Sequence, residues 1–270
     1  MTADFATRAR SFDAWADDYD RYRPGYPEHL FRTISSELEL PEQPLVVDLG
    51  AGTGRASLAM AALGWRVTAV EPGKPMLDVL RARASNDGVI VSTIQASAEA
   101  TGLDPASADL ATAAQAFHWF DQSAATTEMA RIVRPGGGVA LFWNVRDAER
   151  SPFVADYHAL LQELFGDADN GQYLQAGRPV GHERTQAALD DAHGFGPPRL
   201  IMLHQESVVT PEQFVGMAFT ASYVRSLPPQ DQDRFRMRLG TLLERHGHAD
   251  GLPFEIPYRI DLWIARRASP

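Results

Sequence analysis

The chain contains no cysteine, and Lys74 is its only lysine among 270 residues. Without cysteine, a disulfide framework, a thiolate nucleophile and a Cys-ligated zinc or iron–sulfur centre are all excluded. A single lysine also disfavours Schiff-base chemistry, which needs a lysine amine at the reacting carbonyl. Several catalytic strategies are therefore excluded before any motif is considered.

Positive charge and long apolar runs are also scarce. The formal net charge is -10, whereas nucleic-acid binding usually requires a basic face, so we expect no nucleic-acid partner. No apolar run is long enough to span a bilayer, and the first residues, "MTADFATRARSFDAWADDYD", are too acidic and polar for a secretory signal. We expect a cytoplasmic protein with no membrane partner.

Apolar runs alternate with helix-like segments between Leu45 and Ala140. This alternation predicts an α/β fold with a parallel sheet. The runs are continuous, as in "LVVDLG" and "GGVALFWNV", which is typical of strands that helices cover on both faces. Two later runs, "PRLIMLHQESVV" and "FEIPYRIDLWIARR", predict a closing antiparallel pair.

These patterns divide one structural domain into parts. We expect residues 45–146 to form the α/β core. Residues 147–198 contain an amphipathic helix, "SPFVADYHALLQELFG", and a polar loop, "DADNGQYLQAGRPVGHERTQ", which we expect to lie over the site as a lid. Residues 199–270 contain the last strands and a helical segment that we expect to cap the substrate.

A glycine-rich turn follows the first strand of the core. In "DLGAGTG" the residues Gly50, Gly52 and Gly54 are spaced G-x-G-x-G, which differs from the dinucleotide fingerprint G-x-G-x-x-G. Such a turn lets a ligand approach backbone N–H groups closely. Glu71 ends the next strand, where a carboxylate can accept both ribose hydroxyls and would repel the 2′-phosphate of NADP. The turn therefore predicts a nucleoside-containing ligand.

Four motifs, in order, resemble those of class I S-adenosylmethionine-dependent methyltransferases: "DLGAGTG", "AVEP", "ASAEATGLDPASADLATAAQAFHWFD" and "EMARIVRPGGGVALFWN". The opening "FDAWADDYDRYRPGYP" and "QAFHWFD" are similar to type 11-like small-molecule members, which include trans-aconitate-type enzymes. The resemblance implies a Rossmann-like, mostly parallel seven-stranded sheet with an antiparallel final strand and a helical cap. It also implies that S-adenosyl-L-methionine is the cofactor and that residues 1–44 fold over it.

The resemblance assigns roles to residues of these motifs. Arg23 would hold the cofactor carboxylate, and Asp48 would reach its ammonium group or tie the loop amides, unless it only stabilises the turn. Ser97 stands where many relatives have an aspartate that contacts the adenine amine. The implied cofactor-binding residues are Tyr19, Tyr22, Arg23, Asp48, Gly50, Ala51, Gly52, Thr53, Gly54, Glu71, Pro72, Met76, Ser97, Ala98, Glu99, Gln115 and Ala116.

Catalytic and acceptor-binding candidates lie in two segments. His118 could remove a proton from a hydroxyl acceptor, or it could be a structural residue beside Trp119; a carboxylate acceptor needs no base. Trp119 and Phe120 would form a pocket wall. In "FTASYVRSLP", Tyr223 and Arg225 could face the substrate, with Arg225 pairing with a carboxylate, or they could lie on a solvated helix face. The histidines form no ligand cluster, so we expect no catalytic metal.

The sequence predicts a methyltransferase that moves a methyl group to an oxygen, a nitrogen or a carboxylate of a small metabolite. The alternatives are a cyclase or lyase that acts on the same cofactor, and a non-catalytic regulatory protein that binds it. The expected partner is a small-molecule acceptor. The expected oligomeric state is a monomer or a homodimer.

Overall fold

The computed structural model describes residues 24–165, 182–192 and 194–268. Its centre is a seven-stranded sheet with the order β3-β2-β1-β4-β5-β7-β6. The first five strands are parallel, and β7 is antiparallel to both of its neighbours. This confirms the predicted α/β fold with an antiparallel end. The strands are β1 (Leu45–Leu49), β2 (Arg66–Val70), β3 (Val91–Ile94), β4 (Ala108–Ala114), β5 (Val133–Arg146), β6 (Arg199–Val209) and β7 (Phe254–Arg266).

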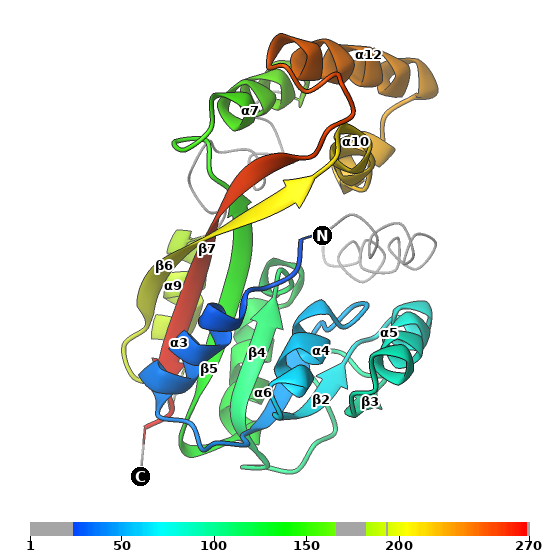
Figure 1. Cartoon of the computed structure of the whole chain (residues 1–270). Coiled ribbons are helices and arrows are strands. Elements are labelled where there is room, and N and C mark those ends of the chain that lie inside the picture. The colour runs from blue at the N-terminus through cyan, green and yellow to red at the C-terminus, as the bar shows by residue number, and fades with distance from the viewer. Residues whose placement is uncertain (1–23, 166–181, 193, 269–270) are drawn as a thin grey trace.

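Helices cover both faces of the sheet (Figure 1). Successive side chains of a strand point to opposite faces, so Val46 and Val47 of β1 belong to different apolar clusters. One face packs against α3, α4 and α5, and the other packs against α6 and α9. These helices are α3 (Glu28–Leu38), α4 (Arg55–Ala62), α5 (Lys74–Asp87), α6 (Gln122–Ile132) and α9 (His182–Asp190).

Helix α9 corrects one expectation about the polar loop. The loop was expected to continue through Gln186, but a helix begins at His182. Its reason is packing: Thr185 and Leu189 are buried, and Leu189 joins the cluster that α6 forms on the sheet. The preceding loop residues, 166–181, lie outside the described residues, so their role as a lid stays a prediction.

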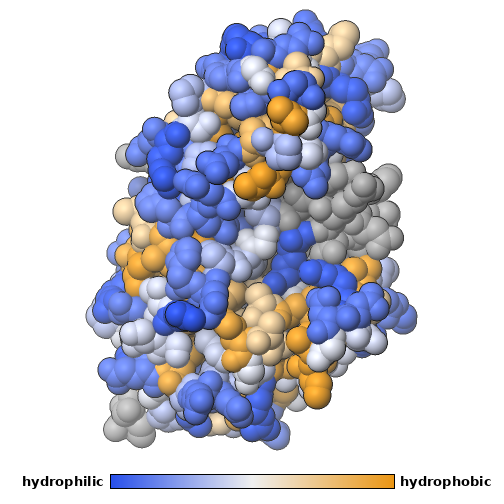
Figure 2. Space-filling model, viewed as in Figure 1, coloured by the Kyte–Doolittle hydropathy of each residue, from blue (hydrophilic) through white to orange (hydrophobic). Residues whose placement is uncertain are grey.

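Strands β6 and β7 extend past the ends of the parallel strands into a helical cap, which is at the top of Figure 1. The cap has a hydrophobic core of its own, in which Tyr157, Phe214 and Phe235 are fully buried. Its outer surface is mainly hydrophilic (Figure 2). The cap consists of α7 (Pro152–Phe165), α10 (Pro211–Phe219), α11 (Ser222–Arg225) and α12 (Pro229–Arg245).

Among the residues that the structure describes, no helix combines the length and the apolar character that crossing a membrane would require.

Candidate active site

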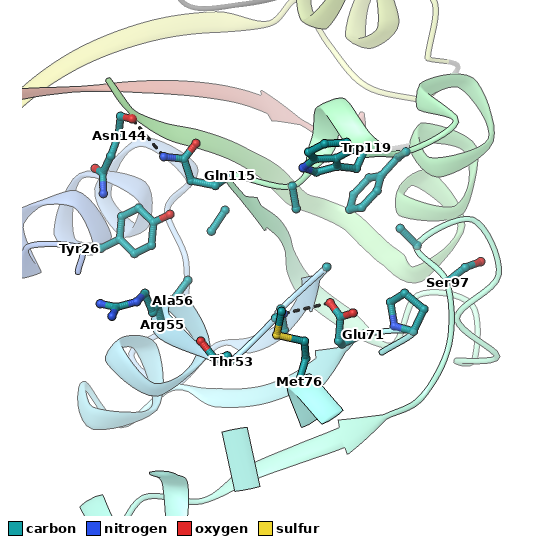
Figure 3. Close-up of a pocket in the computed structure, with 18 of the residues that line it drawn as sticks. Tyr26, Thr53, Arg55, Ala56, Glu71, Met76, Ser97, Gln115, Trp119 and Asn144 are labelled. Carbon is teal, nitrogen blue, oxygen red and sulfur yellow. Dashed lines mark hydrogen bonds between the residues drawn. The ribbon is translucent and has the colours of Figure 1, made fainter. Parts of the chain in front are cut away.

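A cavity of about 710 Å³ lies at the carboxyl ends of the parallel strands and reaches the cap (Figure 3). Its volume is within the range typical of small-molecule sites. Most of its lining comes from the segments that follow β1, β2, β3 and β4, and Asn144 and Arg146 of β5 contribute as well. The lining residues are Pro24, Tyr26, Gly50, Ala51, Gly52, Thr53, Arg55, Ala56, Glu71, Pro72, Met76, Ser97, Ala98, Glu99, Ala114, Gln115, Ala116, Trp119, Phe120, Asp121, Gln122, Asn144, Arg146, Arg184, Met217 and Tyr258.

The three glycines of the first loop have different structural tasks, although all have positive φ. A Cβ at Gly50 would lie 2.7 Å from the Ala116 Cβ, and a Cβ at Gly54 would lie 2.5 Å from the Leu80 Cγ. These two glycines therefore permit close packing inside the protein. At Gly52 an added Cβ would meet nothing within 4 Å. Since Gly52 lines the cavity, it leaves open space for a ligand beside the backbone.

The loop is held in shape by the end of β2. The backbone N–H groups of Gly50 and Ala51 donate to the Val70 carbonyl at 2.8 and 3.1 Å. The Glu71 carboxylate accepts from the backbone N–H groups of Gly52 at 3.0 Å and Gly73 at 2.9 Å. Glu71 also lines the cavity with Met76 near it (Figure 3). It therefore braces the glycine loop and presents a carboxylate to the ligand space.

Asp48 lies beneath the loop, outside the cavity lining, and is only 1% exposed. Its carboxylate accepts hydrogen bonds from Ser57 Oγ at 2.6 Å and Thr112 Oγ1 at 2.8 Å. Burial raises the pKa of Asp48 to about 6, and the two hydroxyl bonds only partly oppose that rise. The described geometry gives Asp48 a supporting role, because it ties β1 to α4 and β4.

The segment after β3 forms another part of the wall. Ser97, Ala98 and Glu99 all line the cavity, and Ala98 is buried. The Glu99 carboxylate accepts from the backbone N–H of Asp121 at 3.0 Å, just before α6 begins. Asp121 in turn caps α6 by accepting from the Ala124 N–H. Glu99 thus joins this wall to α6.

The chain turns sharply after β4. Gln115 has φ +55°, which is uncommon for a residue other than glycine and is often found at functional sites. Its backbone N–H donates to the Phe142 carbonyl at 2.9 Å, and its side-chain Nε2 donates to the Asn144 carbonyl at 3.0 Å. The turn places Ala116 in the cavity wall. Trp119, the last residue of the short 3₁₀ helix η2 (Phe117–Trp119), and Phe120, which follows it, line the same wall.

His118 belongs to the same turn but does not line the cavity. Its Nδ1 accepts a hydrogen bond from the Trp143 indole Nε1 at 3.2 Å. Burial lowers the pKa of His118 to about 4, so the ring stays neutral at physiological pH. The ring is neutral and its Nδ1 lone pair accepts the hydrogen bond from Trp143. This arrangement favours the structural role over the role of a general base.

Several lining residues were missed by the sequence reasoning. Asn144 and Arg146 had a usable signal, because they are polar residues at the carboxyl end of an apolar strand. Met217 and Tyr258 had none, because they come from the cap helix α10 and from the antiparallel strand β7. The other residues in this group are Pro24, Tyr26, Arg55, Ala56, Ala114, Asp121, Gln122 and Arg184.

The other candidates either lie elsewhere in the structure or are not described by it. The Arg225 Nε donates to the Phe219 carbonyl at 2.9 Å, and Arg225 lines a separate cavity within the cap. Tyr223 lies in α11, but its side chain is not described. The residues Tyr19, Tyr22 and Arg23 lie outside the described residues, so their roles stay predictions. Within residues 24–165, 182–192 and 194–268, no group of three or more side chains could hold a metal ion.

Comparisons with known proteins agree with this geometry. Residues 47–141 match the methyltransferase domain family. An uncharacterized methyltransferase of Mycobacterium tuberculosis is 32% identical over 265 residues, which cover 96% of each chain. A structure from Anaeromyxobacter dehalogenans, provisionally described as a type II methyltransferase, has a TM-score of 0.66 and 27% identity, and the match covers 92% of this chain and 100% of that one.

A more distant structure shows the same fold. It is phosphoethanolamine N-methyltransferase 2 of Haemonchus contortus, in complex with phosphomonomethylethanolamine and S-adenosylhomocysteine. Its TM-score is 0.57 at 15% identity, and the match covers 98% of this chain and 60% of that one.

The fold and the cavity at the strand ends are typical of Rossmann-like proteins whose ligand contains a nucleoside. The chain belongs to the class I S-adenosylmethionine-dependent methyltransferases, as its motifs predicted. The narrower likeness to trans-aconitate-type enzymes stays a prediction.

Proposed function

We propose that the protein transfers a methyl group from S-adenosylmethionine to an oxygen, a nitrogen or a carboxylate of a small metabolite. The observation that supports this most strongly is the continuity of the cavity. Its lining includes Gly52 and Glu71 at the strand-end loops and Met217 and Tyr258 near the cap. Donor and acceptor could therefore be enclosed in one space, as direct transfer between them requires.

The residues present fit the cofactor that the family uses. The Glu71 carboxylate can accept hydrogen bonds from ribose hydroxyls, and the open space at Gly52 lets a ligand approach the backbone. Met76 and Pro72 offer apolar contact for the adenine ring, with Ser97 and Ala98 at its edge. When bound, S-adenosylmethionine supplies an electrophilic methyl group on a positively charged sulfur.

The chain itself would orient the acceptor and exclude water. Trp119 and Phe120 form an apolar wall, and the hydrogen bond from Gln115 to Asn144 holds the turn after β4. Positioning supplies much of the catalysis when the leaving group is good. None of the described lining residues is a histidine. A carboxylate or a neutral amine needs no proton removed before attack, whereas an alcohol would need a base such as one of the carboxylates that line the cavity.

Calorimetry tests the cofactor. We expect S-adenosylhomocysteine, the demethylated product, to bind and NAD to show no measurable binding. Clear binding of NAD with none of S-adenosylhomocysteine would overturn the proposal.

A second experiment tests the transfer. The protein is incubated with S-adenosylmethionine that carries an isotopically labelled methyl group and with a small-molecule extract, and the products are read by mass spectrometry. We expect label in a metabolite. Methylthioadenosine from the cofactor alone would indicate a cyclase or lyase instead, and tight binding without any labelled product would indicate a regulatory protein.

A further inference from the structure

The part of the cavity next to the cap contains a positive charge that the proposed reaction has not used. Arg146 is the last residue of β5, and it pairs in register with Tyr258 of β7; both residues line the cavity. The cap helix α10 adds Met217, whose sulfur accepts from the Tyr258 hydroxyl at 3.4 Å. Arg146, Tyr258 and Met217 together form the cap end of the cavity.

The acidic lining residues belong to other parts of the wall. Glu71 follows β2, Glu99 follows β3, and Asp121 precedes α6. In Figure 3 the Glu71 and Ser97 side of the cavity lies opposite Asn144, which is two residues before Arg146 on β5. The lining carboxylates therefore lie around the predicted nucleoside position, and the described lining residues include three arginines, Arg55 in α4, Arg184 in α9 and Arg146 at the cap end.

Aromatic rings hold the Arg146 side chain in place. Its Cζ lies 5.2 Å from the centroid of the Tyr157 ring and 5.7 Å from that of the Phe214 ring. Both rings are fully buried in the cap core. Because this surrounding is apolar and Arg146 is half-buried, its attraction for an anion is screened less than it would be at the surface.

A neighbouring histidine does not add a second charge there. Burial and, to a smaller extent, the charge of Arg146 lower the pKa of His158 to about 4. His158, on α7, is therefore neutral at physiological pH, and Arg146 supplies the positive charge of the cap end.

The strand geometry gives a distance. Asn144 and Arg146 are two residues apart on β5 and both line the cavity, so they lie on one face of the strand, about 7 Å apart along it. The Asn144 carbonyl is bonded to Gln115, one of the residues that the family resemblance puts near the methionine part of the cofactor. Arg146 therefore lies two residues beyond Asn144 along β5, on the side toward the cap.

We propose that the methyl acceptor carries a carboxylate that Arg146 binds, and that the methyl group goes to a different atom of the acceptor, nearer the contact between Gln115 and Asn144. This inference rests on the proposed function and narrows its substrate class. The group held by Arg146 is then not the group that reacts. The planar guanidinium can bind a carboxylate through two parallel hydrogen bonds, and Trp119, Phe120 and Met217 provide an apolar wall for the body of the acceptor.

The rival explanation is that Arg146 only fastens the cap to the sheet through Tyr157 and Phe214. In that case the wild type would bind an acid no more tightly than the matching amide. A substitution of Arg146 would then only lower the stability of the protein. The two explanations therefore differ in one measurable quantity, the ratio of affinities for an acid and its uncharged amide.

The test uses 3-phenylpropanoate and 3-phenylpropanamide, which have the same body and differ in charge. Binding is measured by calorimetry in low-chloride buffer, with and without saturating S-adenosylhomocysteine. For the wild type we expect the acid to bind at least about tenfold more tightly than the amide. Arg146→Met should remove this preference, and Arg146→Lys, which keeps the charge but loses the planar fork, should retain part of it. Neither variant should alter S-adenosylhomocysteine affinity by more than about threefold.

The matched control is Arg32→Met, which removes a cation from the exposed side of α3, where Arg32 pairs with Glu28. It should leave the acid preference unchanged. Equal affinity for acid and amide in the wild type, or an acid preference that survives in Arg146→Met, would overturn the inference. If Arg146→Met does not fold, the wild-type ratio and that of Arg146→Lys decide.

If the proposed function is wrong, the calorimetry gives a different result. In that case S-adenosylhomocysteine does not bind to the wild type, while the acid-to-amide ratio measured without it still decides whether Arg146 forms an anion site.

Discussion

The loop end and the cap end of the cavity are built in different ways. At the loop end, Gly52 and Glu71 come from turns next to parallel strands, and the Gly52 backbone N–H donates directly to the Glu71 carboxylate. At the cap end, Arg146, Met217 and Tyr258 come from a strand end, a cap helix and an antiparallel strand, far apart in sequence. The loop end depends on local backbone conformation, and the cap end depends on how the cap packs on the sheet. A change at one end should therefore affect one ligand and spare the other.

The largest expected effect is at the loop end. Gly52→Val places a branched side chain in the open space beside the loop at φ +57°. We expect S-adenosylhomocysteine affinity to fall by at least about 100-fold, because the side chain occupies ligand space and the loop is strained. Calorimetry measures the affinity.

Gly88→Val is the matched control for that variant. Gly88 ends α5 with φ +68°, and an added Cβ there also meets nothing within 4 Å, but Gly88 does not line the cavity. It should show a similar loss of stability with no loss of affinity. Equal losses of affinity in both variants would mean that backbone strain alone explains the result.

A second effect concerns the support beneath the loop. Burial raises the pKa of Asp48 from the ordinary aspartate value of 3.8 to about 6, so the folded state binds the proton more tightly than the unfolded state. The stability of the wild type should therefore fall as pH rises from about 4 to 6 and stay lowered above that range.

Asp48→Asn removes this charge while keeping the shape. Its stability relative to the wild type should rise between pH 4 and 7 by up to about 3 kcal/mol, measured by urea denaturation. An exposed control, Asp87→Asn, should show no such trend. S-adenosylhomocysteine affinity should stay within about threefold of the wild type, since Asp48 lies outside the lining; a loss of 30-fold or more would instead identify Asp48 as a ligand contact.

The smallest expected effect is at His118, in the turn after β4. The Oδ1 atom of His118→Asn can replace Nδ1 as the acceptor for the Trp143 indole. Methyl transfer to the extract should stay within about threefold of the wild type, less than ~1 kcal/mol in the barrier. His118→Leu leaves the indole without that acceptor and should cost ~1–3 kcal/mol of stability. If His118→Asn folds normally but loses transfer more than 100-fold and alters its pH profile, His118 is a general base.

Much of the fold could be predicted from the sequence because its signals are local. The strands from Leu45 onward are continuous apolar runs, and the glycines that end helices and open turns are visible in any window of the chain. The helix at His182 could not be predicted in this way. Its segment is polar, and only the burial of Thr185 and Leu189 against the rest of the protein makes it helical.

The residues of the candidate site also fall into those that local sequence signals predict and those that only tertiary packing places. The sequence alone determined the family, and it predicted the cavity-lining loop residues Gly50, Gly52 and Glu71, because a glycine turn and a strand end depend on neighbours in the chain. Only the tertiary structure decided that Asp48 supports the loop from below, that Arg225 lines another cavity, and that Arg146 lies beside Tyr258. Those placements depend on burial and on pairing between distant segments, and no local pattern of residues encodes them.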